Sequence, residues 1–126
     1  MIRRNTIQKS MVYETVQMLG NHPTAEEVYT CIAEHYPSIG KGTVYRNLGL
    51  LVEEGKLLKI DVPDGPAHYD HTIGRHYHVH CYICGKVDDV IMNQTEDLRN
   101  LVTDLKGFQL KDYSILFSGV CPDCQK

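Results

Sequence analysis

Residues 76–85 read HYHVHCYICG and place three histidines and two cysteines within nine positions. Side chains alternate between the two faces of a β-strand, so His76, His78 and His80 would share one face. Cys81 and Cys84 form a C-x-x-C pair, a tight turn that can direct two thiolates at one ion. The stretch therefore predicts a strand that ends in a metal-binding turn.

A second C-x-x-C pair, Cys121 and Cys124, lies near the end of the sequence. Two such pairs predict a tetrahedral four-thiolate site, for which zinc is the usual ion. Disulfides between the pairs, or a redox function for one pair, are the alternatives. Cys31 is the one other cysteine, and its place on the apolar side of a predicted helix indicates a buried side chain.

The histidines pose a separate question, because four cysteines already satisfy one zinc ion. They are either structural or belong to a second metal. Several histidines on one strand face, with carboxylates nearby, favour a nitrogen and oxygen site for iron, manganese or zinc. The candidate carboxylates are Asp70, Asp88 and Asp89.

The 126 residues suit one ordinary domain or two small ones, and the formal net charge of −3 gives no global sign of nucleic-acid binding. Basic residues gather locally instead, at Arg3, Arg4 and Lys9 and again at Lys41 and Arg46. No apolar run is long enough to span a bilayer, and the N-terminus lacks the apolar core of a signal peptide. We therefore expect a cytoplasmic protein, in which cysteines stay reduced.

The first half of the chain predicts three helices and a β-hairpin. The helices are expected over about 6–19, from a capping box of Thr24 and Glu27 to Pro37, and over about 41–54; strands at 57–62 and 67–70 flank a turn at 64–65. This order is typical of a winged helix, whose third helix enters the major groove of DNA. The helical pattern alone would also fit other small helical domains.

The third helix is expected to leave Tyr45, Arg46 and Asn47 exposed. Arginine can bond guanine in bidentate fashion, and tyrosine can contact a thymine methyl group or a phosphate. The predicted DNA-binding residues are Tyr45, Arg46, Asn47, Thr43, Lys41 and Lys9.

The second half predicts strands over 76–82 and 87–92, a helix over 93–106 and a final strand over 108–120. The helix would bury a stripe of Leu98, Leu101, Val102 and Leu105, and the final strand would deliver Cys121 to the first cysteine pair. A sheet this small leaves an edge and a face uncovered, so we expect pairing with a second copy. The expected fold is α+β, with a winged helix over 1–66, a hinge over 67–75 and an α/β dimerisation and metal-binding domain over 76–126.

Five motifs resemble those of the ferric uptake regulator (Fur) family in order and approximate spacing. They are HPTAEEVY at 22–29, GTVYRNL at 42–48, HYH at 76–78, CxxCGK at 81–86 and CxxC at 121–124. The resemblance covers nearly the whole chain. It implies a homodimeric, metal-responsive repressor of double-stranded operator DNA, with a regulatory metal held between the domains.

Carried over by position, the resemblance implies regulatory ligands at His22, Asp70, His76, His78 and Asp89, and leaves out His80 and Asp88. Such a metal would fix the angle between the domains and therefore the spacing of the recognition helices in a dimer. Without the resemblance, His22 would be interpreted as a surface histidine beside a helix.

The motif at 75–78 also bears on the branch of the family. Iron-responsive members resemble a His-His-Asp-His pattern here, whereas this chain has Arg75-His76-Tyr77-His78, with aspartate at both 70 and 89. This set resembles the peroxide-sensing branch (PerR), in which ferrous iron and hydrogen peroxide oxidise a ligand histidine, here His22 or His76. Manganese would give a repressor blind to peroxide. Arg46 departs from the asparagine of several peroxide sensors.

Two other functions are alternatives to a peroxide-sensing repressor. An iron- or zinc-uptake repressor would use the same scaffold. A metal-dependent hydrolase would need a general base, a nucleophile and an open coordination position, and neither group is evident beside a site with five protein ligands. We therefore expect a regulator and not an enzyme.

Overall fold

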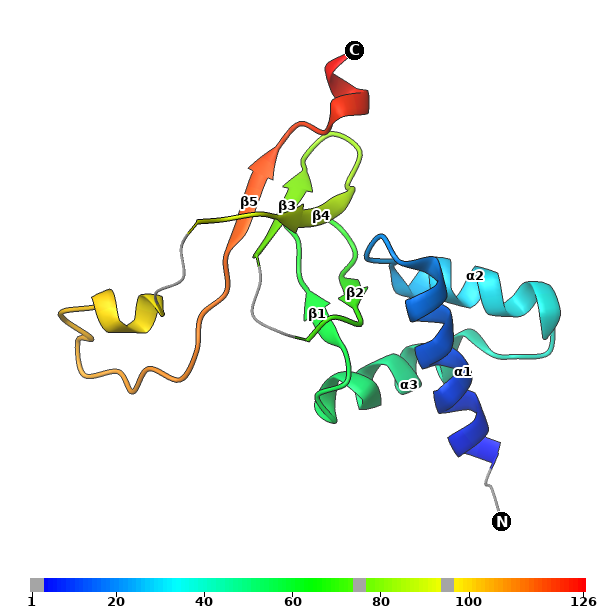
Figure 1. Ribbon diagram of the computed structural model, residues 1–126. Helices are drawn as coiled ribbons and strands as arrows, with labels where there is room; N and C mark the ends of the chain where they lie inside the picture. Colours follow the sequence, from blue (N-terminus) through cyan, green and yellow to red (C-terminus); the bar gives the residue numbers. More distant parts are fainter. Residues whose placement is uncertain (1–3, 74–76, 94–96) are drawn as a thin grey trace. The chain divides into compact units, whose positions relative to one another are not determined.

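The computed structural model describes residues 4–73, 77–93 and 97–126, and the chain divides into two compact units, Met1–Arg75 and His76–Lys126 (Figure 1). We call these the N-terminal unit and the C-terminal unit. No helix among the described residues is long and apolar enough to cross a membrane.

The N-terminal unit contains three helices followed by a two-stranded antiparallel hairpin. Its elements are α1 (Arg4–Leu19), α2 (Ala25–His35), α3 (Lys41–Glu53), β1 (Leu58–Ile60) and β2 (His68–Asp70). The capping box forms as expected, because Thr24 accepts from the backbone N–H of Glu27 and the Glu27 carboxylate accepts from that of Thr24. The predicted winged helix is confirmed.

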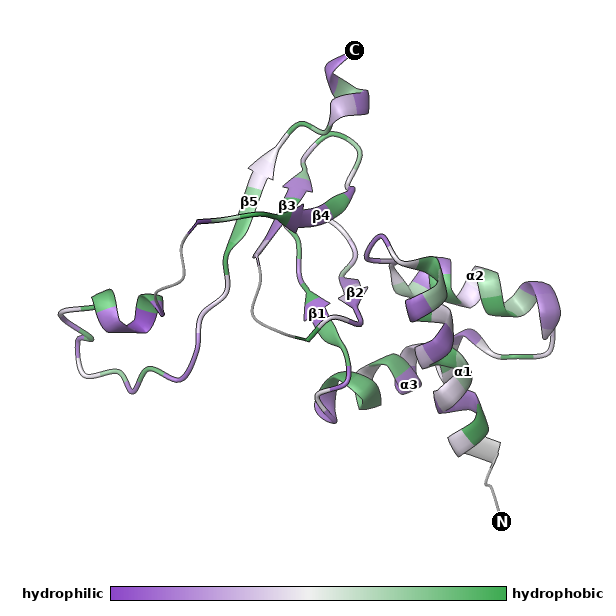
Figure 2. Ribbon diagram, viewed as in Figure 1, coloured by the Kyte–Doolittle hydropathy of each residue, from purple (hydrophilic) through white to green (hydrophobic). Residues whose placement is uncertain are grey.

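One apolar cluster holds the three helices and the hairpin together. Val12 and Val16 of α1 contribute to it, with further buried side chains from α2, α3, β2 and the segments that join the elements: Val28, Ile32, Ile39, Val44, Leu48, Leu51, Leu57 and Tyr69. Figure 2 shows the apolar stretches of these helices in green. Burial of branched aliphatic side chains at this density provides most of the stability of a small domain.

Strand β2 occupies the start of the segment 67–75 that was expected as a hinge. It pairs with β1 in the register Leu58↔Asp70 and Ile60↔His68. The carboxylate of Asp70 therefore sits on a strand of the N-terminal unit.

The C-terminal unit is a three-stranded sheet in the order β4-β3-β5. Its elements are β3 (Tyr77–Cys81), β4 (Val87–Val90), the 3₁₀ helix η1 (Leu98–Leu101), β5 (Leu116–Gly119) and the 3₁₀ helix η2 (Pro122–Gln125). β4 runs antiparallel to β3, and β5 runs parallel to it, with Cys81 opposite Gly119. The parallel return places Cys121 just beyond the end of β3, as expected for the cysteine site.

The predicted helix over 93–106 is wrong. Among the described residues of that range only Leu98–Leu101 is helical, as a short 3₁₀ turn whose start is capped by the Asp97 side chain. The expected buried stripe is largely exposed at Leu101, Val102 and Leu105. An amphipathic helix depends on a layer that covers its apolar face, and the described part of the C-terminal unit supplies none here.

The final strand is also shorter than predicted, since it covers Leu116–Gly119 and not 108–120. Phe108 is 78% exposed, and Leu110 and Phe117 are exposed as well. Strand formation is confined to the part of the segment that finds a hydrogen-bonding partner in β3.

Candidate metal centres and nucleic-acid interface

The four cysteines of the two C-x-x-C pairs converge in the C-terminal unit. Their sulfur atoms all lie within 4.8 Å of one another, and all four thiols are free of disulfides. The sulfurs of Cys84 and Cys121 are 3.7 Å apart. Sulfurs bound tetrahedrally to zinc, with bonds of about 2.3 Å, lie about 3.8 Å apart. The donor set and its spacing therefore fit zinc, and the disulfide alternative is excluded in this structure.

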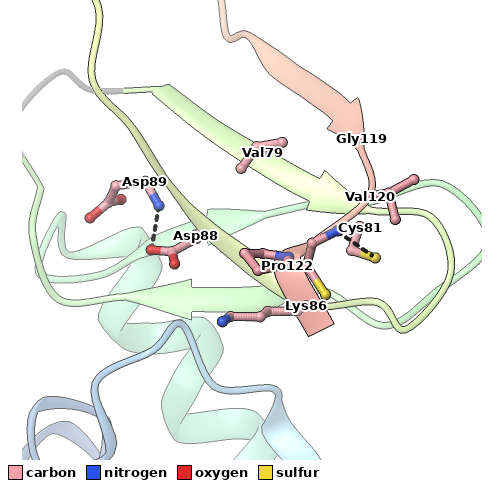
Figure 3. A pocket seen from close by; sticks show the side chains of 9 residues that line it. Val79, Cys81, Lys86, Asp88, Asp89, Gly119, Val120 and Pro122 are labelled. Carbon is pink, nitrogen blue, oxygen red and sulfur yellow. Dashed lines mark hydrogen bonds between the residues drawn. The ribbon is translucent and has the colours of Figure 1, made fainter. Parts of the chain in front are cut away.

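Local backbone geometry explains why the cysteines converge. Cys81 ends β3, and Gly85, with φ of +86°, turns the chain back so that the N–H of Gly85 donates to the Cys81 carbonyl. The N–H of Cys84 donates to the Cys81 sulfur at 3.5 Å. The N–H of Cys121 donates to the same sulfur at 3.4 Å (Figure 3). The sulfur of Cys81 thus accepts from backbone N–H groups of both C-x-x-C pairs.

These donors stabilise the thiolate of Cys81 and lower its pKa from 9.0 to about 6. The neighbouring Cys121 thiol, followed by burial, raises the pKa of Cys124 to about 12. Metal binding at this cluster must therefore displace protons, since zinc binds thiolates and not thiols.

A histidine–aspartate pair lies in the N-terminal unit. The Nε2 atom of His22 is 3.2 Å from an oxygen of Asp70, and both side chains are only 7% exposed. The other Asp70 oxygen accepts from the backbone N–H of Thr72 at 2.9 Å. A buried imidazole beside a carboxylate is a donor pair suited to a divalent cation. His22 is not the surface histidine that its sequence context alone would suggest.

A second histidine–aspartate pair lies in the C-terminal unit. His78 on β3 is directly opposite Asp89 on β4, and its Nε2 atom is 3.5 Å from an Asp89 oxygen. Asp88 turns away, and its carboxylate accepts from the backbone N–H of Asp89 at 2.8 Å (Figure 3). The strand pairing therefore places the Asp89 carboxylate, and not that of Asp88, beside His78. His80 is buried on β3, and His76 lies outside the described residues.

The expected DNA-reading helix is α3. It exposes Lys41, Tyr45 and Arg46, while Thr43 is partly buried. The expected exposure of Asn47 is wrong. This side chain is 2% exposed, and its amide donates to the carbonyl of Thr43, because position 47 lies between Val44 and Leu48 on the face of α3 that meets the core.

Glu26 on α2 is a feature of this surface that the sequence did not indicate. Its carboxylate is 3.0 Å from the Lys41 ammonium and accepts from the Tyr45 hydroxyl at 3.4 Å. The hydrogen bond with Glu26 raises the pKa of Lys41. Lys9, a predicted phosphate contact, is 2.7 Å from Glu54 and lowers the pKa of that carboxylate. Both lysines therefore have carboxylate partners in the absence of DNA.

Comparison with known proteins supports one family. The sequence profile of the Ferric uptake regulator family matches residues 3–118. The chain is 29% identical to the peroxide-responsive repressor PerR of Staphylococcus saprophyticus, covering 97% of this chain and 82% of that protein. It is 28% identical to the peroxide operon regulator of Bacillus subtilis, covering 98% and 85%. The peroxide stress regulator of Campylobacter jejuni has a similar structure, with a TM-score of 0.74 and 27% identity over 96% of this chain and 91% of that one.

Proposed function

Because this chain belongs to the ferric uptake regulator family, a family of metal-dependent transcriptional repressors, we propose that it represses transcription in response to hydrogen peroxide. The observation that carries the proposal is the pair of buried histidines, His22 and His78, each beside an aspartate. Similarity to peroxide regulators over almost the whole chain supports the same branch.

The proposed regulatory site uses His22, Asp70, His76, His78 and Asp89 to bind Fe²⁺ or Mn²⁺. Imidazole and carboxylate donors suit both ions. Ligands drawn from both units would restrict their relative motion, so metal binding would lower the entropic cost of placing two recognition helices on one operator. Dimeric helix-turn-helix proteins typically bind two half-sites about 34–36 Å apart.

Ferrous iron bound at this site would supply the electrons that activate hydrogen peroxide. In the net reaction one oxygen atom of peroxide would be added to the imidazole of His22 or His76, and the other would leave as water. An oxidised imidazole is a poorer donor, so the metal and then the DNA would be released. Manganese(II), which is harder to oxidise, would occupy the same donors without this reaction.

The test begins with protein purified without oxygen and loaded with Fe²⁺ or with Mn²⁺. After peroxide treatment, mass spectrometry of the peptides that contain His22 and His76 should show one added oxygen in the iron form only. Operator binding should fall in that form alone. Unmodified histidines together with intact operator binding by the iron form would assign the protein to the metal-uptake regulators of the family.

Asp89→Glu provides a matched variant for the oxidation step. The longer carboxylate can chelate the metal with both oxygens and block the coordination position that peroxide needs. Metal-dependent DNA binding should be retained while histidine oxidation slows. Asp88→Glu alters the neighbouring carboxylate, which accepts a hydrogen bond from the backbone N–H of Asp89, and histidine oxidation in this variant should proceed at the normal rate.

We also propose that the four-cysteine cluster holds a structural zinc ion and that the C-terminal unit forms a homodimer. The sulfur spacing supports the first proposal. Exposed apolar side chains on the C-terminal unit support the second, among them Ile91, Leu101, Phe108 and Phe117. Size measurement of the zinc-loaded protein in solution tests the dimer directly.

A further inference from the structure

The turn that carries His22 has an unusual backbone. Gly20, Asn21 and His22 have φ angles of +57°, +47° and +55°, so three successive residues lie in the left-handed region. Glycine adopts this region freely, whereas asparagine and histidine adopt it uncommonly, although more often than most other residues. A contact from outside the turn also holds His22 in this conformation.

The principal contact comes from His68, a buried residue of β2 that no motif singled out. Its Nδ1 atom is 2.6 Å from the backbone carbonyl oxygen of His22. A carbonyl oxygen can only accept a hydrogen bond, so Nδ1 of His68 carries the proton and donates it. This bond joins positions 46 residues apart in the sequence.

Strand β2 thus acts on both parts of His22. His68 and Asp70, two residues apart, share one face of the strand. His68 bonds the main chain of His22, and Asp70 lies beside its ring. The backbone N–H of Tyr69 also donates to the carbonyl of Pro23 at 2.8 Å, which secures the segment immediately after the turn.

We propose that His68 is a positioning residue for metal binding, which holds the His22 backbone so that the imidazole Nε2 points to Asp70 and to a divalent cation. The inference rests on the proposed role of His22 and Asp70 as metal ligands. His68 is not among the residues whose ligand atoms converge around His22 and Asp70, so its effect on the metal would pass through the conformation of His22. Groups that orient metal ligands in this way typically change metal affinity 10–100-fold when removed.

The test uses the full-length, zinc-loaded protein and measures the dissociation constant of Mn²⁺. In His68→Leu the donor is lost and the volume is largely kept, so Mn²⁺ binding should weaken about 10–100-fold. The amide nitrogen of asparagine occupies nearly the position of the histidine Nδ1, so His68→Asn should restore affinity to within a few-fold of the wild type. His35→Ala, at an exposed histidine, is the control and should bind Mn²⁺ normally.

The asparagine variant distinguishes positioning from general destabilisation, since it removes the ring and keeps the donor. Thermal unfolding of each variant without Mn²⁺ shows whether the fold is retained. The proposal is overturned if His68→Leu binds Mn²⁺ as well as the wild type does, or if His68→Asn binds as weakly as His68→Leu. His22→Ala distinguishes failure of the regulatory site from failure of the His68 proposal. If His22→Ala binds Mn²⁺ normally, the proposed regulatory site is wrong. If His22→Ala loses Mn²⁺ binding and His68→Leu does not, only the role of His68 is rejected.

Discussion

The two units differ in how they exclude water. The N-terminal unit encloses a continuous cluster that includes the fully buried Val12, Val16, Val28, Val44 and Leu48. In the described part of the C-terminal unit, the buried apolar residues are Tyr77, Cys81 and Val87, while many larger side chains face solvent. A core of this size cannot offset the conformational entropy of ordering the chain. The first unit is therefore stabilised by burial, and we expect the second to depend on bound metal and on a partner surface.

The largest effect should come from removing a zinc ligand. Cys121→Ser should lose zinc, dimer formation and ordered structure of the C-terminal unit, because structural zinc sites contribute about 10–16 kcal/mol of apparent binding free energy. The N-terminal unit should keep its slow amide hydrogen exchange. Zinc content, solution mass and exchange of the two units are the measurements.

Cys31→Ser is the matched control, since Cys31 lies on α2 outside the cluster, and it should remain zinc-loaded and dimeric. A Cys121→Ser protein that stays dimeric and binds zinc would contradict the contrast between the units.

A cavity in the core of the N-terminal unit should destabilise that unit and leave the C-terminal unit unchanged. Leu48→Ala removes a fully buried side chain and should lower the unfolding free energy of the N-terminal unit by about 2–5 kcal/mol. Zinc content and the dimer should be unchanged. Denaturant unfolding monitored separately in each unit makes the measurement, and Leu50→Ala, at an exposed position of the same helix, should cost about 0.5 kcal/mol or less. Equal losses for the two leucines would show that this core does not dominate.

A third prediction concerns pH and the C-terminal unit. The pKa of Cys81 is lowered from 9.0 to about 6 by backbone N–H donors from Cys84 and Cys121. Its ionised form therefore stabilises the folded unit fully above pH 9.0, and this contribution is lost as pH falls through about 6. The metal-free, reduced protein should show thiolate ultraviolet absorbance that appears near pH 6.

That absorbance should vanish in Cys81→Ser and persist in Cys124→Ser, because the Cys121 thiol, followed by burial, raises the pKa of Cys124 instead. A single transition near the ordinary thiol value in the wild type would show that the folded cluster does not form without metal.

The smallest effect should lie on the surface of the N-terminal unit. Glu26→Gln frees Lys41 from its carboxylate partner and should modestly strengthen binding to all DNA sequences. Binding should also become more dependent on salt, since one more cation is available to phosphate. Binding measured at several salt concentrations tests this. Glu34→Gln, near the other end of α2, should change neither the DNA affinity nor its salt dependence. An equal gain in affinity from both variants would show that Glu26 acts only through the net charge of the protein.

The same contrast explains which features could be predicted from the sequence. The start of α2 was predictable because Thr24 and Glu27 cap it locally, and the cysteine cluster was predictable because ligand spacing reflects a fixed coordination geometry. The prediction of a helix over 93–106 failed because an apolar stripe shows that the side chains need to be buried, but it does not show which surface would bury them. That surface is absent from the described part of the C-terminal unit.

The buried position of Asn47 was available from helical spacing, three residues after Val44 and four before Leu51, and the expectation wrongly followed its exposed neighbours instead. The contact of His68 was not available. Its acceptor is a backbone carbonyl 46 residues away, and because every residue has such a carbonyl, the amino-acid sequence does not identify this one as the acceptor.

The parallel pairing of β5 with β3 also has a consequence during protein synthesis. Cys81 and Cys84 must wait for a strand and a cysteine pair that lie about 37 positions later in the chain. A ribosome adding 5–20 residues per second needs roughly 2–7 s to make that stretch. During this interval the winged helix has been synthesised, but the four-cysteine cluster cannot yet close. A chain cut short before Cys121 would keep the winged helix and lack two of the four cysteines of the cluster.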